Sequence, residues 1–395
     1  METKLFREDK GIVLVLAMLV LLVATLVGVS SLNTSTYDVR ISANERASVQ
    51  AFYVAEAGIN EFMGRFRAGA ANQISDNDPS NPAWKLLLAK DSGKGAAQIA
   101  YASGDLNCIP SLQNQMDFGV EIRHKIDEAN QVINYGGVPV YIAKSYGFTA
   151  EGGNRVLEVE LMKSPDYDPP SALYSKMPVH VHGSSAYING NDSCGTASKP
   201  GIATTTATTP PITEWGNPLI LGSPPRVTQA GPLSATNLPL KEMIGYLKGV
   251  ANFKYGYSES QTLAGYSDSW GTPTSDDSTV PITYTGPMNI IYFNLQGTQT
   301  LKLTGDSRGA GLLLVEGSLE IHGGFTWYGV ILVTGAVGYT GSGQRIITGG
   351  IMAGENGTMG TNIDENTSII YCSAVSRRLK EIIPPLKINR WREIF

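Results

Sequence analysis

The sequence predicts an α+β chain: a long N-terminal helix, a small antiparallel β-meander head, and a mostly-β C-terminal domain built as a β-helix or β-solenoid. Three observations predict this class. An apolar run near the N-terminus continues into a helical pattern, with no proline before Pro79. Alternating strand patterns and turn residues come next, and the C-terminal half carries glycine-bounded apolar segments that recur about every 20 residues.

The composition agrees with this class and excludes others. The 395 residues include 44 glycines and 21 prolines but only 16% charged residues, which favours turns and strands over long soluble helices. The formal net charge is -5, so the chain lacks the basic surface that nucleic acid requires. We therefore expect no nucleic-acid partner, and no pattern indicates a cofactor.

The long helix begins with an apolar run from Ile12 to Val29. At 1.5 Å per residue this run extends about 27 Å, which is enough to cross the bilayer core. The basic residues Lys4, Arg7 and Lys10 precede it. Positive charge marks the cytoplasmic side, so we expect an inner-membrane protein with its C-terminal region in the periplasm.

Three interpretations of this segment compete. A secretory signal would need a small-residue cleavage site after the run, and residues 27–31 are a poor one. A plain uncleaved anchor fits the run itself. A leader that is cut on the cytoplasmic side explains more, because a short polar segment ends at Gly11 and the apolar run begins directly at Ile12.

The helix is expected to continue beyond the membrane run, over residues 12–69 in all. Small and apolar residues recur there at helical spacing and form one stripe of an amphipathic helix. The rod would measure about 85 Å. The stripe consists of Val39, Ala43, Ala47, Ala51, Ala55, Ile59, Phe62 and Phe66.

Two segments of this rod carry a family resemblance. Residues 11–17 read Gly-Ile-Val-Leu-Val-Leu-Ala, and residues 51–59 read Ala-Phe-Tyr-Val-Ala-Glu-Ala-Gly-Ile. Together they resemble the N-terminal domain of the PilX-type minor pilins. The motif residues on the helix are Tyr53, Ala55, Glu56, Ala57 and Gly58.

The resemblance implies a processing site and a function. It implies cleavage of a prepilin leader (residues 1–11) by a prepilin peptidase after Gly11, and methylation of the new N-terminus at Ile12. It further implies a structural minor pilin-like subunit that primes assembly of, or caps, a type IV pilus or related filament, and not an enzyme. The implied partners are other minor and major pilins, the peptidase, the inner-membrane assembly machinery and the lipid bilayer.

Leu16 departs from the pattern of major pilins, which carry Glu at the fifth position of the mature chain. In those proteins the Glu neutralises the N-terminal amine of a neighbouring subunit inside apolar surroundings, where an unpaired charge is costly. A subunit with no neighbour above it has no amine to neutralise. The Leu therefore fits a priming or tip subunit, similar to the K-type minor pseudopilins of type II secretion, and the filament system served stays open.

A head domain is expected at residues 70–165, followed by a linker at 166–170 that is marked by proline and aspartate. Gly-containing turns separate three strand patterns, and the apolar helix stripe can cover the resulting meander. The expected strands are residues 117–126, 139–150 and 155–163.

A β-helix-like domain is expected at 171–376, with an inserted loop and helix region at 197–285 that includes a short helix at 238–250. Its repeat begins at Gly311, Gly329 and Gly350, with spacings of 18 and 21 residues. An ordinary β-sandwich with accidental spacing is the alternative. Residues 377–395 are expected to form a C-terminal tail.

Candidate chemistry is sparse. His180 and His182 share one face of a strand and, with Asp192 and Cys194, could bind a metal; the alternative is a polar outer face. Carboxylates for polysaccharide cleavage are available, yet Asp306, Glu316 and Glu320 form no recognisable pair. Two other functions therefore stay open: a membrane-anchored β-helix that binds surface glycans or acts as an adhesin, and a polysaccharide-acting enzyme.

The cysteines do not decide the compartment. Cys108, Cys194 and Cys372 are widely spaced and odd in number, so they form neither a zinc pattern nor a dense disulfide framework. Either one pair forms a disulfide in an oxidising compartment, with the pair not readable from spacing, or all three are thiols.

Overall fold

The computed structural model describes residues 9–66, 74–76, 78–89, 98–101, 117–135, 137–165, 167–205, 210–223, 227–229, 239–265, 269–272, 286–295, 299–354 and 360–394. Cys108 lies outside these ranges. The chain divides into two compact units. Unit 1 takes Met1–His124, Tyr141–Glu160 and Ile388–Phe395, and unit 2 takes Lys125–Val140 and Leu161–Lys387.

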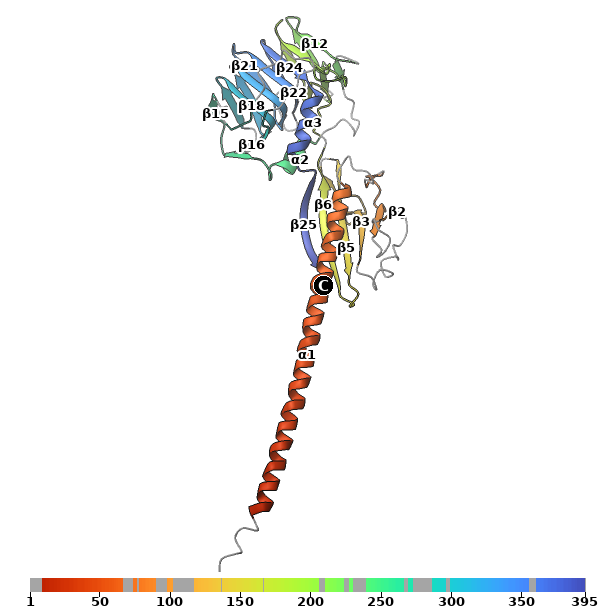
Figure 1. Cartoon of the computed structure of the whole chain (residues 1–395). Coiled ribbons are helices and arrows are strands. Elements are labelled where there is room, and N and C mark those ends of the chain that lie inside the picture. The colour runs from red at the N-terminus through yellow and green to blue at the C-terminus, as the bar shows by residue number, and fades with distance from the viewer. Residues whose placement is uncertain are drawn as a thin grey trace, which may run out of the picture. The chain divides into compact units, whose positions relative to one another are not determined.

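The N-terminal helix α1 spans Asp9–Phe66 and is 58 residues long (Figure 1). No proline interrupts it, and its first half is apolar on all sides. It is long and apolar enough to cross a membrane. The expected long helix is therefore confirmed as far as Phe66, and residues 67–69 lie outside the described ranges.

The sheet of unit 1 has the strand order β2-β1-β3-β5-β6-β25, with β4 paired to β5. β1, β3 and β5 are antiparallel neighbours, with Leu88 opposite Val120 and Val120 opposite Ser145. The three expected strands appear as β3, β5 and β6. The strands are β1 (Lys85–Ala89), β2 (Gln98–Tyr101), β3 (Phe118–His124), β4 (Asn134–Tyr135), β5 (Val138–Phe148), β6 (Asn154–Lys163) and β25 (Leu386–Ile394).

The last strand corrects the expected tail at 377–395. These residues form the end of a helix and then β25, which lies beside β6 in the sheet (Figure 1). Two ion pairs hold it in register: Arg392 with Glu158 at 2.5 Å, and Arg155 with Glu393 at 3.0 Å. β25 covers an edge of β6 that would otherwise expose unpaired backbone groups. The larger segment of unit 2, Leu161–Lys387, therefore lies in chain order between two neighbouring strands of the head sheet, with its ends in those two strands.

In the described part of the chain, unit 2 contains two parallel sheets of eleven and seven strands. From β14 to β24, successive strands alternate between the two sheets. The larger sheet holds β7 (Leu173–Ser175), β9 (Tyr187–Asn189), β10 (Ile202–Thr204), β12 (Leu219–Leu221), β13 (Val227–Gln229), β14 (Phe253–Tyr257), β16 (Asn289–Leu295), β18 (Ser307–Glu316), β20 (Phe325–Val333), β22 (Arg345–Ala353) and β24 (Thr367–Tyr371). The smaller holds β8 (Val179–His182), β11 (Ile212–Trp215), β15 (Gln261–Ala264), β17 (Thr300–Thr304), β19 (Ser318–His322), β21 (Val337–Thr340) and β23 (Thr361–Ile363).

The glycine repeat has a structural cause. Gly311, Gly329 and Gly349 lie side by side in register on three neighbouring strands, so the third repeat begins one residue before the predicted Gly350. All three have positive φ. A Cβ at Gly329 would lie 1.8 Å from the carbonyl oxygen of Gly311, so only glycine allows the strands to approach here.

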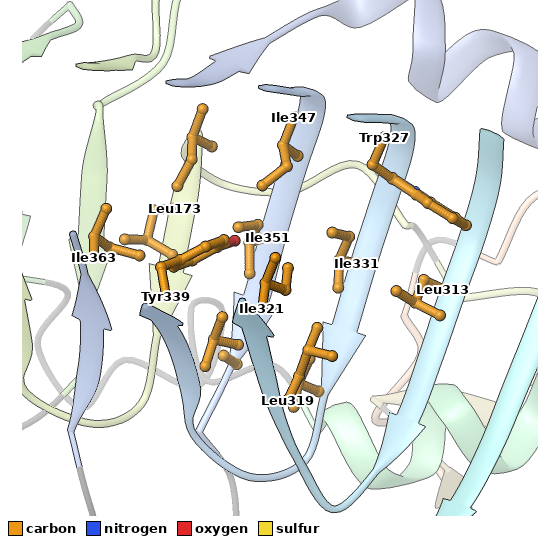
Figure 2. Close-up of a cluster of buried hydrophobic side chains, with 14 of the residues drawn as sticks. Leu173, Leu313, Leu319, Ile321, Trp327, Ile331, Tyr339, Ile347, Ile351 and Ile363 are labelled. Carbon is orange, nitrogen blue, oxygen red and sulfur yellow. The ribbon is translucent and has the colours of Figure 1, made fainter. Parts of the chain in front are cut away.

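The main core of unit 2 lies between the two sheets. Figure 2 shows Ile321 and Tyr339 from the smaller sheet pointing toward Ile331 and Ile351 from the larger one, and all four are buried. The outer face of the larger sheet is also apolar, and it is covered by α2 (Leu240–Leu247) and α3 (Ser373–Ile382). The outer face of the smaller sheet is polar, as the alternation of buried and less buried residues in β17 and β19 indicates.

Two boundaries differ from the expectation. The region at 197–285 contains β10–β15, which belong to the sheets. Three of these strands, β10, β12 and β13, have only three residues each, which is too short for a readable alternation. The expected helix at 238–250 appears as α2. The linker at 166–170 is packed, because Tyr167 is buried and its hydroxyl donates to the Met243 carbonyl at 3.0 Å.

The order of the strands produces a seam. The first strand set of unit 2, β7–β8–β9, lies beside the last set, β22–β23–β24, and all three pairings are parallel. A disulfide joins Cys194, which follows β9, to Cys372, which follows β24. The pairing that the sequence left open is thus decided by the meeting of segments 178 residues apart.

Candidate functional site

The small residues of the α1 motif allow the helix to lie very close to the head sheet. Ala51 and Ala55 are fully buried. A Cβ at Gly58 would lie 2.4 Å from the Ser145 hydroxyl oxygen, and one at Gly147 would lie 2.1 Å from the Ala51 carbonyl oxygen. The motif positions Ala55 and Gly58 therefore serve helix–sheet packing, since larger side chains would push the helix away.

The other motif residues point away from the sheet. Tyr53 is 62% exposed, Ala57 is exposed and Glu56 is half-buried. Val49 and Asn60 continue the same side of the helix and are exposed as well. We call Val49, Tyr53, Ala57 and Asn60 the free stripe. An exposed aromatic and aliphatic stripe along a helix is the kind of surface that a second helix covers.

The predicted amphipathic stripe is buried only in part. From Ala47 to Phe66 its members contact the head, whereas Val39 and Ala43 are exposed. The run from Ile12 to Val29 is exposed throughout, Leu16 included. Gly11 and Ile12 lie inside α1, and cleavage between them stays a prediction.

A buried polar cluster lies next to the end of α1. His124 Nδ1 lies 2.7 Å from the Asn81 carbonyl oxygen, and its Nε2 lies 2.8 Å from Asp76 Oδ2. The Tyr141 hydroxyl donates to the same carboxylate oxygen at 2.7 Å. Phe66 packs edge-on against Tyr141, with ring centroids 4.7 Å apart, so the cluster ties the helix end to the sheet.

The electrostatics of this cluster favour an ionised Asp76. Burial alone would raise its pKa, but the hydrogen bonds from His124 and Tyr141 outweigh burial and lower the pKa below its ordinary value. Each ring nitrogen of His124 lies within hydrogen-bond distance of an oxygen atom, the Asn81 carbonyl on one side and the Asp76 carboxylate on the other. Burial, followed by the bond to Asp76, raises the pKa of Tyr141.

The histidines considered as metal ligands lie elsewhere, on β8. His180 and His182 alternate with buried valines, and both rings pack against Trp215 of β11, with centroids 5.6 Å and 4.2 Å away. Cys194 is in the disulfide, and Asp192 Oδ1 accepts hydrogen bonds from the backbone N–H groups of Cys194 and Ser373.

The two histidines therefore contact Trp215. The other expected ligands form different bonds, Cys194 in the disulfide and Asp192 with backbone N–H groups. Across the ranges that the structure describes, no three or more His, Cys, Asp and Glu side chains are grouped so that they could hold a metal ion. The histidine pair remains a surface feature of the smaller sheet.

Two of the carboxylates considered for catalysis, Glu316 and Glu320, are held by other side chains. Glu316 accepts from the Tyr292 hydroxyl at 2.6 Å and pairs with Lys248 at 3.3 Å. Glu320 pairs with Lys302 at 2.8 Å. The two glutamates belong to different sheets, because Glu316 ends β18 and Glu320 lies within β19. The structure does not bring them together as an acid–base pair.

Asp168 is a structural residue that sequence reasoning missed. Its carboxylate accepts from the Tyr371 hydroxyl at 3.0 Å and the Ser376 hydroxyl at 2.6 Å, and it pairs with Lys199 at 2.5 Å. These partners lie next to the seam of unit 2. No local pattern could reveal them, because Tyr371 is 203 residues away in the chain.

Comparison with known proteins agrees with the geometry of α1. The PilX N-terminal family model matches residues 10–60. The resemblance to PilX-type minor pilins is confirmed over this segment. A solved structure, the competence-associated pilin ComZ from Thermus thermophilus, matches with 10% identity and a TM-score of 0.25, over 88% of this chain and 98% of that chain. The search of curated proteins found no match. The family match ends within α1 and leaves unit 2 outside it.

Proposed function

We propose that this protein is a minor pilin-like structural subunit that primes assembly of, or caps, a type IV pilus or a related filament. The proposal rests on one observation, which is that the two halves of α1 have different surroundings. Its apolar half is free of protein contacts, its second half is packed closely on the head, and the free stripe is left uncovered. In a filament the apolar half would enter the shared core, and the stripe would contact neighbouring subunits.

The proposal includes processing and location. The prepilin peptidase cuts after Gly11, Ile12 becomes the methylated N-terminus, and the apolar half of α1 anchors the protein in the inner membrane with the head sheet and unit 2 in the periplasm. The exposed apolar run and the disulfide support this arrangement, because disulfides persist in oxidising compartments. The assembly machinery and other pilins are the partners, and the role is structural rather than catalytic.

We further propose that the subunit occupies one end of the filament. Leu16 offers no carboxylate for the amine of an upstream neighbour. Unit 2, which we interpret as a β-solenoid, would crowd a shaft in which every subunit carried a copy. Immunogold labelling with an antibody against unit 2 tests this location. Label spread evenly along the shaft would exclude it.

The free stripe provides the direct test of the assembly role. We expect Tyr53→Glu to lower filament number, because a carboxylate would be buried against an apolar neighbour. Tyr135→Glu is the matched control, since Tyr135 is 50% exposed on the hairpin of β4. Membrane level and leader cleavage should be unchanged in both variants. Normal filament number with Tyr53→Glu would contradict the assembly role of this stripe.

A further inference from the structure

The two sheets of unit 2 present different outer faces. Helices α2 and α3 cover the apolar outer face of the larger sheet. The smaller sheet instead aligns polar residues in register across neighbouring strands. One outward row is Lys302, Glu320, Gly338, Asn362, His180 and Thr213.

At one end of this face, Trp215, His180 and His182 form what we call the aromatic platform. Trp215 lies on β11, at one end of the strand order of the smaller sheet, and is 48% exposed. Its ring packs on His182, with centroids 4.2 Å apart, and on His180, with centroids 5.6 Å apart and planes 19° apart. Both histidines come from β8, the one neighbouring strand of β11 in this sheet. The side of the ring away from β8 therefore has no described strand against it.

Hydrogen-bonding groups surround the platform. His180 is flanked in register by Thr213 on one side and Asn362 on the other. The Nδ1 atom of His180 is buried and has no hydrogen-bond partner among the described residues. The hydroxyl of Thr213 and the amide of Asn362, next to His180 in register, can donate and accept hydrogen bonds.

The charge around the platform selects the class of ligand. Lys302 in the outward row is paired with Glu320, so it offers no free cation to a polyanion. Glu365 packs over Gly183, the residue that follows His182, and adds negative charge at that corner. Phosphate-rich ligands bind through Lys and Arg, and neither residue type occupies the register positions beside His180 and His182 on β11 and β23.

We propose that Trp215, His180 and His182, with Thr213 and Asn362, form a binding site for an uncharged polysaccharide. A pyranose ring has an apolar C–H face, which stacks on an indole, and a rim of hydroxyls that donate and accept hydrogen bonds. The platform offers the matching surfaces side by side. The inference rests on the proposed function, because a filament would carry this site to the cell exterior, where such glycans occur.

The test uses the full chain in a detergent without a sugar headgroup. The protein is first screened against an array of uncharged cell-surface glycans. Its affinity for the glycan that binds best is then measured by calorimetry. We expect Trp215→Ala to weaken binding by about tenfold or more. Trp391→Ala is the matched control, because Trp391 is 40% exposed on β25 and should not affect affinity. Trp215→Phe keeps a flat ring and should retain part of the affinity.

Three results would overturn the site: no glycan of the array bound by the native chain, equal affinity with Trp215→Ala, or binding of double-stranded DNA in preference to every glycan. Thermal unfolding of Trp215→Ala checks that unit 2 is intact, and His182→Ala provides a second variant that should weaken binding if the first fails to fold. Filament number separates the two proposals. Normal filaments from a native chain that binds no glycan of the array would refute this site alone. Intact glycan binding together with a normal filament number in Tyr53→Glu would refute the assembly role alone.

Discussion

The seam between the first and last strand sets of unit 2 should depend on the disulfide. The perturbation is the double substitution Cys194→Ala with Cys372→Ala. Both sulfurs are buried, Cys372 completely. The bond closes a loop with a sequence separation of 178 residues. In the chain-entropy description, a cross-link that closes a loop of this length lowers the entropy of the unfolded chain. It thereby raises the free energy of unfolding by about 5 kcal/mol.

Other contacts at the seam limit the local damage. Asp192 still accepts backbone hydrogen bonds from both sides, and Asp168 still binds Tyr371 and Lys199. The parallel pairing of β7 with β22 does not need the sulfurs either. We therefore expect unit 2 to fold without the disulfide but to unfold at a lower denaturant concentration. The seam strands should then exchange amide hydrogens faster than the middle strands β18 and β20.

The assay is guanidinium unfolding of the full chain, with hydrogen exchange read for each strand. Cys108→Ala is the control, because Cys108 is not part of the bond, and it should leave the midpoint unchanged. An unchanged midpoint in the double variant would refute the entropic reasoning. Peptide mapping of the oxidised protein provides a second check. A disulfide between Cys108 and either Cys194 or Cys372 would refute the seam itself.

Three further predictions concern unit 1 and processing. Gly147→Ala should destabilise unit 1 by about 1–3 kcal/mol in thermal unfolding, because its Cβ would meet the Ala51 carbonyl, whereas Gly64→Ala, with nothing within 4 Å, should not. Because the pKa of Asp76 is lower in the folded than in the unfolded state, the ionised carboxylate stabilises the fold at pH values above its unfolded pKa of about 3.9. This stabilisation is lost as the pH falls through the pKa of Asp76 in the folded state. Asp76→Asn should flatten this acid dependence in unfolding curves, and a full slope in the variant would assign it to other groups. Gly11→Arg should leave the precursor uncut; intact-mass analysis checks this, and a normal mature mass would move the cleavage site.

Local patterns in the sequence were sufficient for the elements whose stabilising contacts are local or repeat regularly. The uninterrupted apolar and small-residue spacing predicted α1, because a helix is set by neighbours three and four residues apart. The glycine repeat predicted parallel stacking of strands, because each successive strand meets the same steric limit at the same position. In the third copy the glycine in register is Gly349 instead of the predicted Gly350, which shows that register depends on contacts across strands.

The tertiary structure alone decided the features that join distant segments. β25 resembles a polar tail in sequence, and it becomes a strand only because β6 offers it an edge and Arg155 and Glu158 offer it charges. Cys194 forms a disulfide with Cys372 because the last strand set of unit 2 pairs with the first. Trp215 joins His182 only through the register of two short strands. The sequence by itself determined the pilin-like rod and the repeating strands, whose energies are local, whereas the seam and the platform arise from pairings that no local pattern encodes.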